Sequence, residues 1–216
     1  MKPLQKGMTL IEMVIAISLL AIMISAIVFS FDGSKSRAQV LVAAMNEYAG
    51  ALERMKTDTS CYPRKLSGLF ERGAVETPAN SFCGADLSKQ WNGPYVKAAP
   101  ADNDGKVMLA QISPDIKLSI VQQNSNFGGT TGSGIGTNKW YILAEGVPSE
   151  IALQAVIACN GVDNANATTG GATVGGVPKC ARNGDDIGQW RVTGLTLGNV
   201  TDPLQNLYLL FNETRR

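Results

Sequence analysis

The distribution of apolar and polar positions divides the chain into a uniformly apolar segment, an amphipathic segment and a longer part of mixed pattern. Residues 8–31 form the apolar segment, and Glu12 is the only charged residue in it. A helix of this length is about 36 Å long, enough to cross ~30 Å of hydrocarbon. A core helix of a soluble domain is rarely apolar on every face over such a length. The pattern therefore predicts a membrane-spanning helix.

The charges that flank this segment predict its orientation. Lys2 and Lys6 precede it, and the first charge after it is Asp32. By the positive-inside rule the short N-terminus stays in the cytoplasm and the rest of the chain is exported. A cleaved secretory signal is the competing interpretation, but it has a shorter apolar centre and a small-x-small site after it. Here the small residue that stands out is Gly7, which precedes the apolar segment.

An amphipathic helix is predicted to continue over residues 32–56. Apolar side chains recur there at i, i+3 and i+4, and charged side chains lie mostly off that stripe. Such a helix buries its apolar stripe against a folded head. The stripe consists of Val40, Leu41, Ala44, Met45, Tyr48, Ala49, Leu52 and Met55.

Residues 57–216 have the length of one domain and a pattern of short alternating segments. A turn signal, Asn103-Asp104-Gly105, precedes the first of these segments. A short helix is predicted over Ser149–Ala158, with Ser149 as its N-cap and Asn160-Gly161 at its end. We expect an α+β fold in which the long N-terminal helix lies on a mainly antiparallel sheet. The predicted strands are Val107–Ile112, Ile116–Gln122, Trp140–Glu145, Gln189–Leu197 and Leu207–Phe211.

Four cysteines fit an exported domain in an oxidising compartment. Cys61 and Cys83 are 22 residues apart, and Cys159 and Cys180 are 21 apart. Three connectivities are possible. Local pairing is favoured, since each bridge would close a modest loop and contribute ~3 kcal/mol. The chain has no histidine and no CxxC pair, so a zinc site is not predicted.

The composition also argues against catalysis and against broad nucleic-acid binding. Without histidine there is no Ser-His-Asp or Cys-His arrangement, and a net charge of +1 provides no extended basic face. The glycine-rich stretches 126–138 and 161–186 lack the Gly-Lys-Ser/Thr of a phosphate-binding loop and are predicted to be exposed loops. Residues 102–105, Asp-Asn-Asp-Gly, hint at calcium, but their spacing departs from the EF-hand and favours a turn. We predict no enzyme activity, no cofactor and no metal.

The N-terminal residues resemble a known family. Lys6-Gly7, then Met-Thr-Leu-Ile-Glu over residues 8–12 and an apolar helix, is similar to the class III leader of type IV pilins and pseudopilins. The resemblance implies that a prepilin peptidase cleaves between Gly7 and Met8 and methylates the new N-terminus at Met8. It divides the chain into a leader (1–7), a transmembrane or filament-core helix (8–31), its amphipathic continuation (32–56) and a head (57–216).

The same resemblance gives Glu12 a role. A carboxylate in hydrocarbon costs roughly 2.5–3.5 kcal/mol, so it needs a partner. In the family this glutamate pairs with the N-terminal amine of a neighbouring subunit, which here would be Met8. The alternative is that Glu12 only complements the helix dipole, an effect of about 0.3–1 kcal/mol.

Other segments agree with the resemblance. Trp91-Asn92-Gly93-Pro94-Tyr95 and Cys61-Tyr62-Pro63 are similar to segments that follow the helix in many pilins and pseudopilins, where they need only provide aromatic packing at turns. A C-terminal disulfide loop is common in pilins, which supports pairing of Cys159 with Cys180. Met8 at the mature start and a head of about 160 residues resemble the type IVb group. The seven-residue leader is shorter than that group usually has.

Three functions remain open from the sequence. The first is a filament-forming type IV pilin that serves adhesion, motility, DNA uptake or conjugation. The second is a minor pilin or a type II secretion pseudopilin, and the third is a membrane-anchored periplasmic enzyme or binding protein. For the first two, the expected partners are the prepilin peptidase, identical subunits, the assembly machinery of the inner membrane and membrane lipid before assembly. The chain would reside in the inner membrane and then in an extracellular filament.

Overall fold

The structure is a computed structural model that describes residues 11, 13–18, 33–126, 136–161, 173–174, 177–182 and 202–215. The chain divides into two compact units, Met1–Gly33 and Ser34–Arg216. In the first unit residues 13–18 are helical. Within the described part of the chain, no helix has the length and apolar character that a membrane crossing requires. The span predicted over residues 8–31 lies mostly outside the described residues.

The long helix α2 (Gly33–Thr59) begins one residue after the predicted start and ends three residues beyond the predicted end. It buries a stripe at helical spacing, as predicted, but Val40 is 48% exposed and does not belong to it. Val40 precedes the buried Leu41 by one position, a rotation of about 100° that turns its side chain away. The buried residues of α2 are Ala38, Leu41, Met45, Tyr48, Ala49, Ala51, Leu52, Met55 and Thr59.

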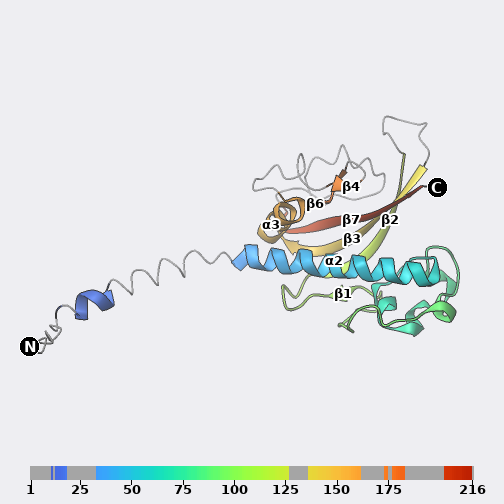
Figure 1. Ribbon diagram of the computed structural model, residues 1–216, viewed down its shortest axis with the longest axis horizontal. Coiled ribbons are helices and arrows are strands. Elements are labelled where there is room, and N and C mark those ends of the chain that lie inside the picture. Colours follow the sequence, from blue (N-terminus) through green and yellow to red (C-terminus); the bar gives the residue numbers. More distant parts are fainter. Residues whose placement is uncertain are drawn as a thin grey trace, which may run out of the picture. The chain divides into compact units, whose positions relative to one another are not determined.

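A five-stranded antiparallel sheet forms the other layer of the second unit (Figure 1). Its strand order is β1-β2-β3-β7-β6, so the last strand in the chain lies inside the sheet. A separate pair, β4 (Thr173–Val174) and β5 (Val177–Pro178), is also antiparallel. The predicted α+β class, with a helix packed on an antiparallel sheet, is confirmed. The strands of the large sheet are β1 (Val107–Met108), β2 (Lys117–Asn126), β3 (Gly136–Pro148), β6 (Cys180–Arg182) and β7 (Leu204–Arg215).

The predicted strands differ from the observed ones in extent. The prediction over Val107–Ile112 was too long, because β1 ends at Met108 and the chain then turns. In that turn Leu109 and Ile112 are buried, so their apolar spacing reflects core packing rather than a strand. β3 and β7 extend beyond both of their predicted ends, whereas β2 begins one residue later than predicted and continues past its predicted end; β6 was not predicted. The strand predicted over Gln189–Leu197 lies outside the described residues.

The core lies between α2 and the sheet. Leu41, Met45 and Leu52 of α2 belong to one buried cluster with Ile142 of β3 and Leu209 of β7. A second set of buried residues alternates with the core positions along the strands, so both faces of the central strands are buried. This set is Tyr141, Leu143, Ala181, Tyr208 and Leu210.

Two further segments complete the second unit. Between α2 and β1 the chain forms four short 3₁₀ helices, which the sequence pattern did not predict. α3 (Ser149–Asn160) starts at the predicted residue, but Pro148 rather than Ser149 occupies the N-cap, and the N–H of Ser149 donates to Pro203 O. At the other end Gly161 adopts the left-handed conformation, which suits glycine. The 3₁₀ helices are η1 (Leu66–Leu69), η2 (Arg72–Val75), η3 (Pro78–Asn80) and η4 (Ser88–Gln90).

Candidate assembly segment and the bridges of the head

The candidate assembly residues Gly7, Met8 and Glu12 lie outside the described residues, so cleavage, methylation and charge pairing remain predictions. Their described neighbours are apolar side chains that are each more than half exposed. Removing such surface from water is favourable, so this segment is suited to contact lipid or another protein chain. These side chains are Ile11, Met13, Val14, Ile15 and Ile17.

The C-terminal bridge joins Cys159 at the end of α3 to Cys180 at the start of β6. Its two Cα atoms are 6.0 Å apart and its residues are 21 apart in sequence. Both cysteines are buried. The bridge attaches α3 to the edge strand of the large sheet and closes the stretch between them into a loop.

Asn160 reinforces this attachment through a second connection to Cys180. Its Nδ2 donates to Cys180 O at 3.0 Å, and its Oδ1 accepts from Cys180 N at 2.9 Å. Among the described residues β6 is the edge of the sheet, so no further strand pairs with these backbone groups there, and the Asn160 amide takes that place. The sequence interpretation assigned Asn160 only to the end of a helix, since no local pattern marks a contact across 20 residues.

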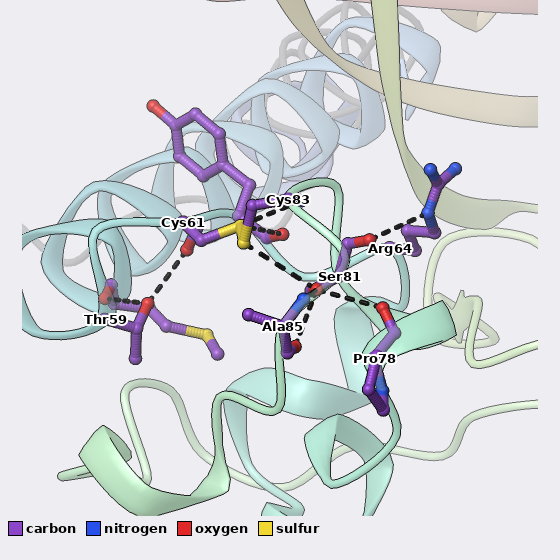
Figure 2. The surroundings of a disulfide bond; sticks show 9 residues. Thr59, Cys61, Arg64, Pro78, Ser81, Cys83 and Ala85 are labelled. Atoms are coloured by element: carbon purple, nitrogen blue, oxygen red, sulfur yellow. Dashed lines mark hydrogen bonds between the residues drawn. A yellow bond between two sulfur atoms is a disulfide. The ribbon is translucent and has the colours of Figure 1, made fainter.

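The N-terminal bridge joins Cys61, just after α2, to Cys83 (Figure 2). Cys83 N donates to Cys61 Sγ at 3.2 Å. Ser81, which is buried, accepts from Ala85 N at 2.8 Å through its hydroxyl, and its carbonyl accepts from Arg64 Nε at 3.0 Å (Figure 2). These bonds fix the loop that carries Cys83. Both observed bridges are the local pairs that the sequence favours.

The Trp91–Tyr95 segment fastens the loop region to α2. Trp91 Nε1 donates to Gly68 O at 2.9 Å, and the Tyr95 hydroxyl donates to Asp58 Oδ2 at 2.8 Å. Arg54 Nη2 donates to Tyr95 O at 2.8 Å. The rings of Trp91 and Tyr95 meet edge to face at 5.9 Å. The segment therefore has the packing role that the sequence favours, with hydrogen bonds in addition.

A polar cluster connects the C-terminal half of α2 to β7. The Tyr62 hydroxyl donates to Glu53 Oε1, and Asn212 Nδ2 donates to the same carboxylate at 2.7 Å. Burial and the adjacent Glu53 raise the pKa of Tyr62, so its hydroxyl stays protonated as a donor. Glu53 and Asn212 are 159 residues apart, and the sequence interpretation missed this contact because no local signal predicts it.

The Asp-Asn-Asp-Gly stretch forms a turn. Asp102 Oδ1 accepts from Asp104 N and Lys106 N, and Asp102 Oδ2 pairs with Lys117 Nζ at 3.1 Å. Gly105 takes a positive φ of 75°. The carboxylate of Asp102 is thus already engaged by donors of the protein. Within the described ranges no group of three or more histidine, cysteine or acidic residues could hold a metal ion.

Comparisons with known proteins agree with the leader resemblance. Residues 2–28 match the family model of the prokaryotic N-terminal methylation motif. The type II secretion system core protein G of Klebsiella pneumoniae is 27% identical over 137 residues, which cover 59% of this chain and 95% of that protein. The protein of the same name from Escherichia coli (strain K12) is 26% identical over 136 residues, covering 57% of this chain and 92% of that protein. No solved structure matches.

Proposed function

We propose that this chain, which carries the methylation motif of type IV pilins and pseudopilins, is a structural subunit of a type IV pilus. The observation that carries the proposal is this motif over residues 2–28, followed by a head in which a long helix packs on an antiparallel sheet. The two relatives support the same broad class. Since their matches cover under three fifths of this chain, it has a large part that they lack.

In this proposal a prepilin peptidase removes residues 1–7. Residues 8–31 hold the precursor in the inner membrane and later form the filament core, residues 32–56 continue as the amphipathic helix, and residues 57–216 form the head. The exposed apolar side chains between Ile11 and Ile17 support this role, since they could contact lipid first and neighbouring subunits afterwards. The filament itself would be extracellular.

Processing is the first test. Cleavage after Gly7 gives a mature chain of 209 residues (216 − 7) that begins with N-methylated Met8. Mass spectrometry of the membrane-bound protein measures this directly. Gly7→Asp is expected to block cleavage, while Gly7→Ala, which keeps a small residue, is the control that should be cleaved. An intact Met1 in mature protein, or a cut beyond Phe31, would contradict the proposal and favour a membrane-anchored enzyme or binding protein.

Glu12 is the second test. If its carboxylate pairs with the Met8 amine of a neighbour, Glu12→Ala should lower filament yield while the membrane-bound pool stays normal or grows. Leaving one member of a buried ion pair unmatched costs about 3–5 kcal/mol, whereas loss of a helix-dipole contact costs below ~1 kcal/mol. Glu47→Ala, an exposed position on α2, is the matched control. Normal filaments from Glu12→Ala would reject the pairing role.

A pseudopilin of a type II secretion system is the second candidate, because both relatives carry that name. The two candidates differ in what deletion of the gene removes. A pilin deletion should abolish abundant surface filaments seen by electron microscopy and leave protein secretion intact. A pseudopilin deletion should stop secretion of exoproteins into the medium at normal filament number, and that result would overturn the pilin assignment.

A further inference from the structure

The two disulfide bridges of the head differ in how open they are to other molecules. In the N-terminal bridge Cys83 is exposed and Cys61 is buried. In the C-terminal bridge both Cys159 and Cys180 are buried. A disulfide is broken by a thiolate that must reach one of its two sulfurs, so an exposed bridge is opened more readily than a buried one. The N-terminal bridge is therefore the one that a thiol from outside the chain can attack.

The space beside this bridge also leaves room for an attacking thiol. Cys61 and Cys83 both line a cavity of about 260 Å³, together with Lys56 in the last turn of α2. The N-terminal bridge thus borders a cavity as well as solvent, whereas buried side chains enclose the C-terminal bridge.

The surroundings of Cys61 suit it as the leaving sulfur. When an incoming thiolate bonds to Cys83 Sγ, the electron pair of the S–S bond passes to Cys61 Sγ, which becomes a thiolate. Cys83 N already donates to Cys61 Sγ at 3.2 Å (Figure 2), and such a donor stabilises the negative charge. The partial negative charge at the C-terminal end of α2 opposes the thiolate, and the ammonium of Lys56 in that last turn counters this effect.

Both sulfurs have hydrogen-bond acceptors nearby for the thiols that reduction would form. Tyr62 O lies 3.5 Å from Cys61 Sγ, and Ser81 Oγ lies 3.7 Å from Cys83 Sγ. A thiol is a weak donor, so each S–H can bond to one of these oxygens. The reduced cysteines are therefore accommodated where they stand.

The two segments that carry the cysteines are also held together without sulfur. Arg64 N donates to Asn80 O at 2.7 Å, and Phe82 N donates to Tyr62 O at 3.1 Å. These backbone bonds lie between the chain just after Cys61 and the chain just before Cys83. The two thiols would therefore stay close to each other after reduction, and the bridge could close again.

We propose that the N-terminal bridge is a site of thiol–disulfide exchange that a protein dithiol reduces while the C-terminal bridge stays closed. The first thiolate of the dithiol bonds to Cys83 Sγ and releases Cys61 as a thiolate, which takes up a proton. The second thiolate of the dithiol then attacks the first, which forms the donor's own disulfide and releases Cys83 as a thiolate that is protonated in turn. The dithiol loses two electrons and two protons, and the bridge gains both.

The first test compares the two bridges in the oxidised full chain in detergent micelles. The chain is treated with dithiothreitol, free thiols are blocked with N-ethylmaleimide at successive times, and peptide mapping measures the labelled fraction of each cysteine. Cys61 and Cys83 should be labelled together, at least about tenfold faster than Cys159 and Cys180. Equal rates, or faster opening of the C-terminal bridge, would overturn the proposal. Tryptophan emission should stay that of the folded chain while only the N-terminal bridge is open, and unfolding at that stage would contradict a reversible site.

The second test identifies the attacked sulfur with a protein dithiol. The probe is a thioredoxin-type protein whose resolving cysteine is replaced by serine, so that its mixed disulfide persists. It should be trapped on Cys83 and leave Cys61 free to react with N-ethylmaleimide. Trapping on Cys61 or on the C-terminal bridge, or no trapping at all, would reject the proposed attack.

A pair of lysine variants tests the stabilisation of the leaving sulfur. Lys56→Gln should slow reduction of the N-terminal bridge a few-fold, because it removes the charge that counters the end of α2. Lys35→Gln, at an exposed position near the start of α2, is the matched control and should leave the rate unchanged. An unchanged rate in Lys56→Gln, in a chain that melts at the wild-type temperature, would overturn the role given to Lys56.

Discussion

Replacing Asn160 by alanine should destabilise the head by about 2–4 kcal/mol, although the C-terminal bridge next to it stays intact. The side chain makes two hydrogen bonds of 2.9 and 3.0 Å to the backbone of Cys180. Asn160 is 1% exposed and Cys180 is fully buried. The alanine variant leaves the buried N–H and C=O of Cys180 without these two partners, and each loss costs about 1–3 kcal/mol of folding stability. Relaxation at the sheet edge recovers part of that cost.

This loss is a large share of a typical stability of about 5–15 kcal/mol. For a domain of this size it lowers the melting temperature by roughly 5–15 °C. The measurement is urea unfolding of the full chain in detergent micelles, followed by tryptophan fluorescence under oxidising conditions. Asn92→Ala, at an exposed position, is the control and should stay within about 0.5 kcal/mol of wild type.

Asn160→Asp sharpens the test because it keeps an acceptor for Cys180 N but sets a carboxylate oxygen against Cys180 O. Burial and that carbonyl should raise the pKa of the introduced acid in the folded state. Its stabilising contribution is therefore present at low pH, where the acid donates a proton to Cys180 O, and is lost as the pH rises through the raised pKa. A change below about 0.5 kcal/mol for Asn160→Ala, with no pH dependence for Asn160→Asp, would refute the reasoning.

Three further outcomes are expected. Non-reduced peptide mapping should recover the N-terminal and C-terminal bridges as separate local pairs, and replacing either pair by alanine should cost ~3 kcal/mol in urea unfolding; a peptide that joins the two bridges would contradict this. Gly146→Ala should destabilise by about 1–3 kcal/mol more than Gly161→Ala. Both glycines have a positive φ, but a Cβ at Gly146 would lie 2.3 Å from Asp115 O while a Cβ at Gly161 meets nothing within 4 Å, so equal losses would contradict the clash. Burial is the largest cause of the raised pKa at all five tyrosines. The folded state therefore holds the phenol protons more tightly than the unfolded state, and the stability that this contributes below the ordinary phenol pKa of ~10 should be lost as the pH rises above it. Ultraviolet titration should show tyrosinate appearing together with unfolding, and its appearance in folded protein at the ordinary pKa would be the contrary result.

The parts of the fold that the sequence predicted are those set by periodicity. The apolar stripe of α2 and the alternation at the start of β2 follow directly from which face each element buries. In β3 and β7 the buried residues form continuous runs, because both faces of these strands are covered. Val107–Ile112 was misread because Leu109 and Ile112 are buried from a turn, and burial alone does not distinguish a turn from a strand. The 3₁₀ helices were missed because each is too short to show a period.

The candidate functional residues likewise fall into those marked by a local sequence motif and those brought together only by folding. The leader motif is local, so Gly7, Met8 and Glu12 could be proposed as processing and assembly residues from a few adjacent residues, and they remain predictions. The contacts of Asn160 with Cys180, and of Glu53 with Asn212, join residues that are adjacent only after folding. The sequence does not distinguish an exposed asparagine or glutamate from one whose side chain bonds to a distant strand. Such residues could not be recognised without the structure.

The position of β7 has a consequence for folding during synthesis. This strand, Leu204–Arg215, comes last in chain order but pairs with β3 on one side and β6 on the other. A chain that folds in the order of its synthesis can form α2, the antiparallel pair of β2 and β3, and α3 first, with the hydrogen-bonding groups of β3 still unpaired on one side. Until residues 204–215 arrive, that open edge can accept a strand from any other chain. Chains that are truncated before residue 204 are therefore the ones in which this head is most exposed to mispairing.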